Sequence, residues 1–224
     1  MWSYYGTKKR LAKYYPKPEH NLIIEPFAGA AMYSLYGDNW KKQVYLYDKY
    51  SRVIKLWCYL ISVHEIQFDK LPDMKKGDNV DNFKTLSNAE RDLLGFFCNP
   101  SSAVPKKTCT ARGELAWGRG KKYIADNLYK IRHWVAVHKS YEEISPNLIG
   151  TWFIDPPYQH GGIWYHSSCC NSHINYSELA FWCCQRQGQV IVCENSKADW
   201  LPFKYLHSLS GQLHKTMEVI YTQE

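Results

Sequence analysis

Three short apolar runs in this chain each stop at an acidic residue. The runs and the acids that follow them are 22–24 with Glu25, 44–47 with Asp48, and 150–154 with Asp155. Short apolar runs bounded by turn-forming residues are typical of buried strands. Parallel strands bring their carboxyl ends to one edge of a sheet, where ligands gather. The sequence therefore predicts three acids around a single crevice.

Helical spacing separates these strands. Residues 53–62 and 176–186 have helical periodicity, a helix is expected soon after Gly29, and 189–193 is a fourth apolar strand. Strands that alternate with helices indicate a mostly parallel sheet covered on both faces. The predicted fold class is α/β, with a Rossmann-like central sheet.

The region between the second and third strands has a different composition. Residues 89–98 are predicted to be helical, whereas 99–122 are rich in Pro, Gly, Ser and Thr and hold a single acid, Glu114. We interpret the latter stretch as an inserted loop lobe at the mouth of the crevice that contacts a polyanion; a basic loop that is merely solvated is the alternative. Its basic residues are Lys106, Lys107, Arg112, Arg119, Lys121 and Lys122.

Composition sets further bounds on the function. The 224 residues carry 28 basic and 21 acidic side chains, a net charge of +7, which suits a polyanionic partner. Aromatic residues make up 16% of the chain, as expected for a surface that stacks flat rings or for a core of large side chains. No apolar run approaches the roughly 18 to 20 residues of a membrane span. With no signal-peptide pattern and no C-x-x-C pair, we expect a cytoplasmic protein with free thiols.

The tetrapeptide Asp155-Pro156-Pro157-Tyr158 directly follows the third apolar run. Two prolines remove two backbone donors and fix two φ angles, so the turn is rigid and its carbonyls are expected to point outward as unpaired acceptors. A carboxylate, a bare carbonyl and an aromatic ring together suit a planar group that bears an NH2. A turn that only ends a strand is the structural alternative.

Two weaker signals accompany this turn. Glu25-Pro26-Phe27-Ala28-Gly29-Ala30 places one glycine among small residues after the first strand, where backbone can approach a ligand closely. Asp48 ends the next strand, at the position where an acid can accept hydrogen bonds from both ribose hydroxyls. Their order along the chain and their placement at strand ends favour one combined site.

In these motifs the sequence resembles the Dam-like (class alpha) DNA adenine-N6 methyltransferases, which use S-adenosylmethionine. Tyr4-Tyr5-Gly6-Thr7-Lys8 is similar to the N-terminal cofactor motif of that family, and residues 25–30 to its E-P-F-x-G-x loop. Asp48 falls at its ribose-binding acid, and 155–158 is its catalytic tetrapeptide. Residues 112–122 are similar to its R-G…G-x-x-K-K segment. Relatives of this compact kind are carried by phages and mobile elements.

The resemblance implies a Rossmann-like methyltransferase fold, with a catalytic domain at 1–62 and 136–224 and a target-recognition lobe at 63–135. It implies methyl transfer to the N6 amino group of an adenine flipped out of duplex DNA, with no membrane and no obligate protein partner. The implied catalytic residues are Asp155, Pro156, Pro157 and Tyr158. The implied cofactor contacts are Tyr4, Tyr5, Gly6, Lys8, Glu25, Pro26, Phe27, Ala28, Gly29, Asp48, Tyr141 and Asp155. DNA contacts are expected at Lys106, Lys107, Arg112, Arg119, Lys121 and Lys122.

Three other functions stay open at this level. Cytosine-N4 methyltransferases use a similar turn, although serine commonly replaces its first residue. An RNA methyltransferase would keep the cofactor site with a different lobe, and residues 99–105 lack the aromatics usual in the family's recognition hairpin. A catalytically silent DNA-binding module is the third, against which the intact tetrapeptide speaks.

One further spacing, His166-x-x-Cys169-Cys170-x-x-His173, raises the question of zinc. Adjacent cysteines chelate one ion awkwardly, and the stretch that follows the catalytic turn suits a flap over the flipped base. We therefore predict no metal in this protein.

Overall fold

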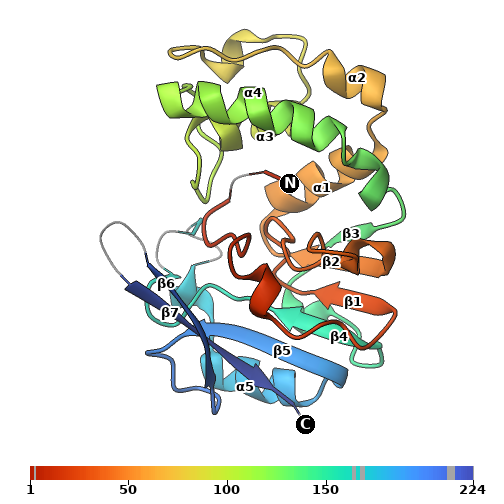
Figure 1. Cartoon of the computed structure of the whole chain (residues 1–224), viewed down its shortest axis with the longest axis vertical. Coiled ribbons are helices and arrows are strands. Elements are labelled where there is room, and N and C mark those ends of the chain that lie inside the picture. Colours follow the sequence, from red (N-terminus) through yellow and green to blue (C-terminus); the bar gives the residue numbers. More distant parts are fainter. Residues whose placement is uncertain (3, 163–164, 167–169, 211–214, 224) are drawn as a thin grey trace.

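The computed structural model describes residues 1–2, 4–162, 165–166, 170–210 and 215–223, and the described part contains a seven-stranded sheet (Figure 1). Its strands lie in the order β3-β2-β1-β4-β5-β7-β6. They are β1 Leu22–Glu25, β2 Gln43–Asp48, β3 Val135–His138, β4 Ile149–Ile154, β5 Gln187–Asn195, β6 Lys204–Ser210 and β7 Lys215–Thr222.

The first five strands are parallel, and β7 pairs antiparallel with both β5 and β6. The order of the parallel strands, 3-2-1-4-5, is that of doubly wound dinucleotide-binding sheets. Strand order reverses between β1 and β4, so a crevice is expected beyond the carboxyl ends of these two strands. The predicted α/β fold with a mostly parallel sheet is confirmed.

Alternating side chains bury both faces of the sheet. Ile23 joins one hydrophobic cluster together with α1 (Ser51–Ser62), whereas its neighbour Ile24 joins a second cluster together with α5 (Tyr176–Cys184). Figure 1 shows these two helices on opposite sides of the sheet. Successive residues of a strand point to opposite faces, so near-continuous apolar runs of this kind are what a sheet covered on both sides requires.

Three further helices, α2 (Glu65–Asp69), α3 (Asn88–Cys98) and α4 (Ala111–Ala125), lie beyond α1 at the end of the molecule away from the sheet (Figure 1). A capping box between Ser87 and Glu90 begins α3. The buried residues of α3 and α4 belong to the same hydrophobic cluster as those of α1 and the N-terminal Trp2. These helices therefore extend the core of the sheet.

The expectation of a loop across 99–122 is wrong for its second half, which forms most of α4. Thr110 caps this helix through its hydroxyl, and Gly113, Trp117 and Ile124 form its buried face at helical spacing. Gly113 lies against the end of α3: a Cβ atom there would stand 2.3 Å from the carbonyl oxygen of Cys98. The glycines that suggested a loop include one that permits close helix packing.

The helix expected after Gly29 is also absent, and residues 32–35 form turns. Ala31 adopts a φ of 46°, which lies outside the helical region and interrupts any helix there. The Glu25 carboxylate instead accepts hydrogen bonds from the backbone N–H and the hydroxyl of Ser34, at 3.0 and 2.6 Å. The Glu25 side chain, rather than a helical backbone carbonyl, therefore accepts the backbone N–H of Ser34.

The remaining elements are single turns of 3-10 helix. They are η1 Ala12–Tyr14, η2 Asn39–Lys41, η3 Val80–Asn82, η4 Leu128–Ile131, η5 Tyr141–Glu143 and η7 Asn171–His173. Within the described ranges, no helix has the length and apolar character that a bilayer crossing requires.

Candidate active site

A pocket with an empty volume of about 910 Å³, partly open to solvent, lies beyond the carboxyl ends of β1, β2, β3 and β4. It is lined by residues 4–8, 25–32, 48–50 and 140–142, by Phe153, Asp155 and Pro157, and by Tyr165, His166, Cys170, His173 and Ile174. Every predicted cofactor contact lines this one pocket.

The turn after β1 is bound to the end of β2. The backbone N–H of Ala28 donates to the Tyr47 carbonyl at 2.9 Å, and that of Gly29 donates to Oδ2 of Asp48 at 3.0 Å. Gly29 has a φ of 43°, and a Cβ atom there would stand 3.2 Å from the ring of Tyr4. Glycine thus serves both the left-handed backbone and the close aromatic neighbour.

Asp48 is held from two sides, because its second oxygen accepts the backbone N–H of Tyr50 at 2.8 Å. Burial raises the pKa of its carboxyl to about 6, although the two backbone hydrogen bonds act to lower it. Each carboxylate oxygen has two lone pairs, so both oxygens retain capacity for a further donor. The carboxylate therefore presents a fixed acceptor edge to the pocket.

Aromatic rings form walls of the same pocket. The rings of Phe27 and Tyr141 lie 5.5 Å apart at 33°, and Tyr141 packs edge-on against Trp182 of α5. Tyr50 and His166 stack at 4.8 Å and 19°. These rings give the pocket apolar, flat surfaces of the kind that bind a planar heterocycle.

A buried ion pair stands at the inner end of the pocket. Nζ of Lys8 lies 2.6 Å from Oδ1 of Asp155, with the two side chains 7% and 18% exposed. Burial raises the pKa of Asp155 to about 6, while the charge of Lys8 acts to lower it. Burial also lowers the pKa of Lys8, but the charges of Asp155 and Glu218 outweigh it, and the net pKa lies above its ordinary value. Lys8 is therefore a cation at neutral pH.

The two proline carbonyls of the tetrapeptide differ. The Pro157 carbonyl accepts the Tyr176 hydroxyl at 2.6 Å, so the expectation of a bare acceptor is wrong there. The Pro156 carbonyl has no hydrogen-bond donor among the described residues. The Asp155 carboxylate lines the pocket, whereas Pro156 is buried and does not line it.

A second, wider pocket adjoins the first and has an empty volume of about 1,890 Å³ with open solvent included. Tyr158, Gln159 and Glu218 line it, and residues 4–8 and Tyr165 line both pockets. Nζ of Lys8 lies 4.7 Å from the centre of the Tyr158 ring. Lys8 therefore contacts Asp155 of the first pocket and Tyr158 of the second, at the point where the two meet.

Several lining residues escaped the sequence interpretation. Tyr50 lies two residues after Asp48, so its position just beyond a strand end was the available signal. Tyr165 and His166 come from the stretch interpreted as a flap. Glu218 lies on β7, a strand that the sequence pattern did not reveal.

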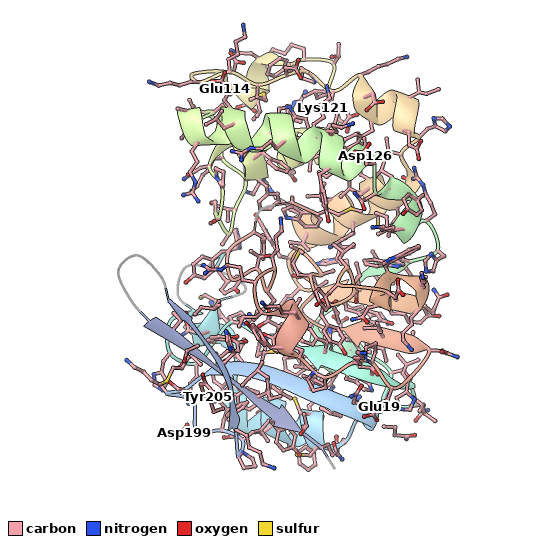
Figure 2. All side chains as sticks on the ribbon, viewed as in Figure 1. Glu19, Glu114, Lys121, Asp126, Asp199 and Tyr205 are labelled. Atoms are coloured by element: carbon pink, nitrogen blue, oxygen red, sulfur yellow. The ribbon has the colours of Figure 1, made fainter. Side chains whose placement is uncertain are left out.

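The basic residues expected to contact DNA are spread over the lobe. Three of them face acids: Lys107 lies 2.7 Å from Asp81, Lys121 lies 3.5 Å from Asp73, and Lys122 lies 3.6 Å from Asp126. Figure 2 shows Lys121 and Asp126 along and just after α4, at the end of the molecule away from the sheet. The side chains of Lys106, Arg112 and Arg119 are exposed.

A second group of basic residues follows the cofactor motif. Residues 1–18 contain no acid, and Lys9, Arg10, Lys13 and Lys17 are exposed. Residues 4–8 and Leu11 of this segment line the second pocket. Nζ of Lys9 lies 5.8 Å from the Tyr123 ring of α4, and the Tyr14 ring stacks on His207 of β6 at 3.7 Å. The segment therefore runs from the lobe to the β6–β7 hairpin. We call Lys9, Arg10 and Lys13 the basic rim.

The predicted absence of metal stays a prediction. Within the described ranges, no three His, Cys, Asp or Glu side chains are grouped to hold an ion. His166, Cys170 and His173 line the first pocket, whereas Cys169 lies outside the described residues.

No model of a known protein family matches the sequence, and a search of curated proteins finds no relative at a significant level. The function is therefore inferred from the residues and the geometry of the two pockets.

Proposed function

We propose that this protein is an amino-methyltransferase that moves a methyl group from S-adenosylmethionine to the N6 amino group of an adenine in DNA. One observation carries the proposal: the predicted cofactor contacts all line one pocket at the strand-order reversal, and that pocket meets a second one at Lys8, Asp155 and Tyr158. A donor and an acceptor in adjoining pockets are what a direct group transfer needs.

The first pocket fits the chemistry of the donor. Asp48, whose orientation is fixed by two backbone donors, would accept the ribose hydroxyls. Phe27 and Tyr141 would contact the adenine ring, and the Gly29 turn leaves room for close backbone approach. When bound, S-adenosylmethionine supplies an electrophilic methyl group on a positively charged sulfur.

The residues at the junction would act on the acceptor amine. Asp155 and the Pro156 carbonyl would each accept one amino hydrogen, which directs the nitrogen lone pair toward the methyl carbon, while Tyr158 would stack on the base. The S–CH3 bond of the donor would break as the N–CH3 bond forms, so the sulfur would leave as a neutral thioether. The nitrogen would then carry the positive charge and lose one proton to water. Positioning and electrostatics supply the rate enhancement, without a covalent enzyme intermediate.

The ion pair with Lys8 gives Asp155 a partner before the acceptor arrives. A buried carboxylate without a partner is costly, so the 2.6 Å contact stabilises the empty site. Asp155 retains its second oxygen for the amino group. Lys8 therefore holds Asp155 charged and oriented while leaving it able to accept a hydrogen bond.

Duplex DNA has to release its target base, because the amino group inside a stacked pair cannot reach Asp155. Flipping costs a few kcal/mol, which contacts to the flipped base and the phosphates offset. The second pocket would receive the base. Residues 4–8 and Leu11, which flank Lys9 and Arg10 in the chain, line this pocket, as does Ser101 of the recognition lobe at 63–135. The basic rim would neutralise phosphates there.

Nucleoside analysis tests this proposal. Duplex DNA and single-stranded RNA are incubated separately with the protein and S-adenosylmethionine, digested, and their nucleosides measured by mass spectrometry. N6-methyldeoxyadenosine in the DNA sample is the expected product. Methylated cytosine would move the reaction to cytosine N4, product only in RNA would change the substrate, and no product in either would favour a DNA-binding module without catalysis.

A further inference from the structure

Glu218 of β7 joins three segments of the chain beneath the second pocket. Its Oε1 accepts the hydroxyl of Tyr158 at 2.7 Å and that of Tyr15 at 2.6 Å. Tyr158 belongs to the turn after β4, and Tyr15 directly follows η1 near the N-terminus. Only 7% of Glu218 is exposed, so this carboxylate is a buried acceptor with two phenol donors.

Each of the two tyrosines contacts a residue at or near the junction of the two pockets. Tyr158 places its ring 4.7 Å from Nζ of Lys8. Tyr15 packs edge-on against Phe153 of β4 at 5.0 Å, two residues before Asp155. A tyrosine ring with a free hydroxyl can swing about its χ1 torsion, whereas one whose hydroxyl is held by a buried carboxylate keeps its ring axis in place.

We propose that Glu218 is a positioning residue that fixes the position of the Tyr158 ring for stacking on the acceptor base, with Tyr15 as the second anchor of the same carboxylate. This inference rests on the proposed methyl transfer. Glu218 itself touches neither reacting atom. Because Glu218 acts through Tyr158, substituting Glu218 is expected to change turnover and acceptor binding and to leave the affinity for the donor unchanged.

Two substitutions separate this role from a general loss of stability. Glu218→Gln keeps an oxygen that accepts the phenol hydrogens, whereas Glu218→Leu removes the acceptor at similar volume. The matched control is Glu90→Gln, because Glu90 is also a buried carboxylate that accepts a phenol, that of Tyr59 at 3.2 Å, and it lines neither pocket.

Steady-state kinetics and a double-mutant cycle read out the result. Glu218→Leu is expected to lower kcat at least about tenfold and Glu218→Gln by no more than about threefold, with S-adenosylmethionine affinity unchanged in both. Glu90→Gln should leave kcat at the wild-type level. In a Tyr158→Phe background, which keeps the ring but lacks the donor, Glu218→Leu should cost much less, because the contact is already gone.

Four outcomes overturn the inference. Equal kcat for wild type and Glu218→Leu would contradict the role of Glu218 and leave the proposed function in place. A cost of Glu218→Leu that is the same in the wild-type and Tyr158→Phe backgrounds shows that the effect does not pass through the phenol. If Glu218→Leu fails to fold, Tyr158→Phe alone decides, since a wild-type kcat for that variant contradicts positioning through the hydroxyl. A wild type that transfers no methyl group removes the proposed function and this inference together.

Discussion

The ion pair of Lys8 and Asp155 sets the charge of the site. Burial raises the pKa of Asp155 to about 6, and the Lys8 cation keeps it from rising further. In the proposed mechanism turnover needs the carboxylate, so activity should be present above this pKa and fall as pH drops through it. The proposed mechanism therefore predicts an acid limb near pH 6 that depends on Lys8.

Lys8→Met should move this acid limb to higher pH, because it removes the cation that lowers the pKa of Asp155. The measurement is the pH profile of kcat at saturating S-adenosylmethionine. Lys55→Met, an exposed substitution on α1, is the control and should leave the profile in place. An acid limb at the same pH in Lys8→Met and wild type would contradict the assignment of the limb to Asp155.

Asp48 tests the donor site separately. Asp48→Asn removes the charge and replaces one acceptor oxygen by a donor, so S-adenosylmethionine should bind about tenfold to a hundredfold more weakly, as for a lost hydrogen bond to a charged group. Titration calorimetry measures this affinity. Asp38→Asn, at an exposed acid, is the matched control. Unchanged affinity in Asp48→Asn would place the donor elsewhere.

At the scale of elements, α4 carries glycines with opposite roles. A Cβ atom at Gly113 would collide with the backbone of α3, whereas one at Gly118 would meet nothing within 4 Å. Gly113→Ala should therefore lower the free energy of unfolding. Gly118→Ala should raise it by about 0.5 to 1 kcal/mol, because alanine favours the helix. Chemical denaturation of both variants checks this, and a shift of the same sign in both would show that the helix is not packed as described.

The elements that could be predicted are those with strong local signals. β1, β2, β4 and β5 are apolar runs with defined ends, and the pattern of α1 repeats at helical spacing. β3 is short and half-exposed, and β6 and β7 mix polar and apolar residues without a regular alternation, so no local signal identified them. α4 could not be predicted because its glycines include one that is required for close packing against α3, a contact that local sequence does not reveal.

The candidate site divides in the same way. The acids at strand ends could be predicted because topology brings parallel carboxyl ends together, and Glu25, Asp48 and Asp155 do line one pocket. Glu218 could not, because its place depends on an antiparallel strand inserted between β5 and β6. The pairing of Lys107 and Lys121 with acids likewise depends on tertiary contacts.

At the scale of the whole molecule, the charges around the second pocket predict how DNA binds. Substituting Lys9, Arg10 and Lys13 by Ala should weaken binding and reduce the slope of log affinity against log salt by about 2 to 3, since each lost phosphate contact removes about 0.9. Fluorescence anisotropy with a labelled duplex measures the slope. The control replaces Lys107, Lys121 and Lys122, which already face acids, and should change it less. A larger change in slope for the control than for the basic-rim variant would indicate that the lobe contacts the phosphates instead.

The central claim is that Asp155, at the junction of two pockets, acts on an adenine amino group while the donor is bound next to it. The most direct measurement follows isotope-labelled methyl groups from S-adenosylmethionine into duplex DNA with wild type and with Asp155→Asn. The mechanism predicts label in deoxyadenosine for wild type, and a rate at least about a hundredfold lower for the variant with its donor affinity retained. Label at the wild-type rate in Asp155→Asn, or no label in deoxyadenosine with wild type, would contradict it.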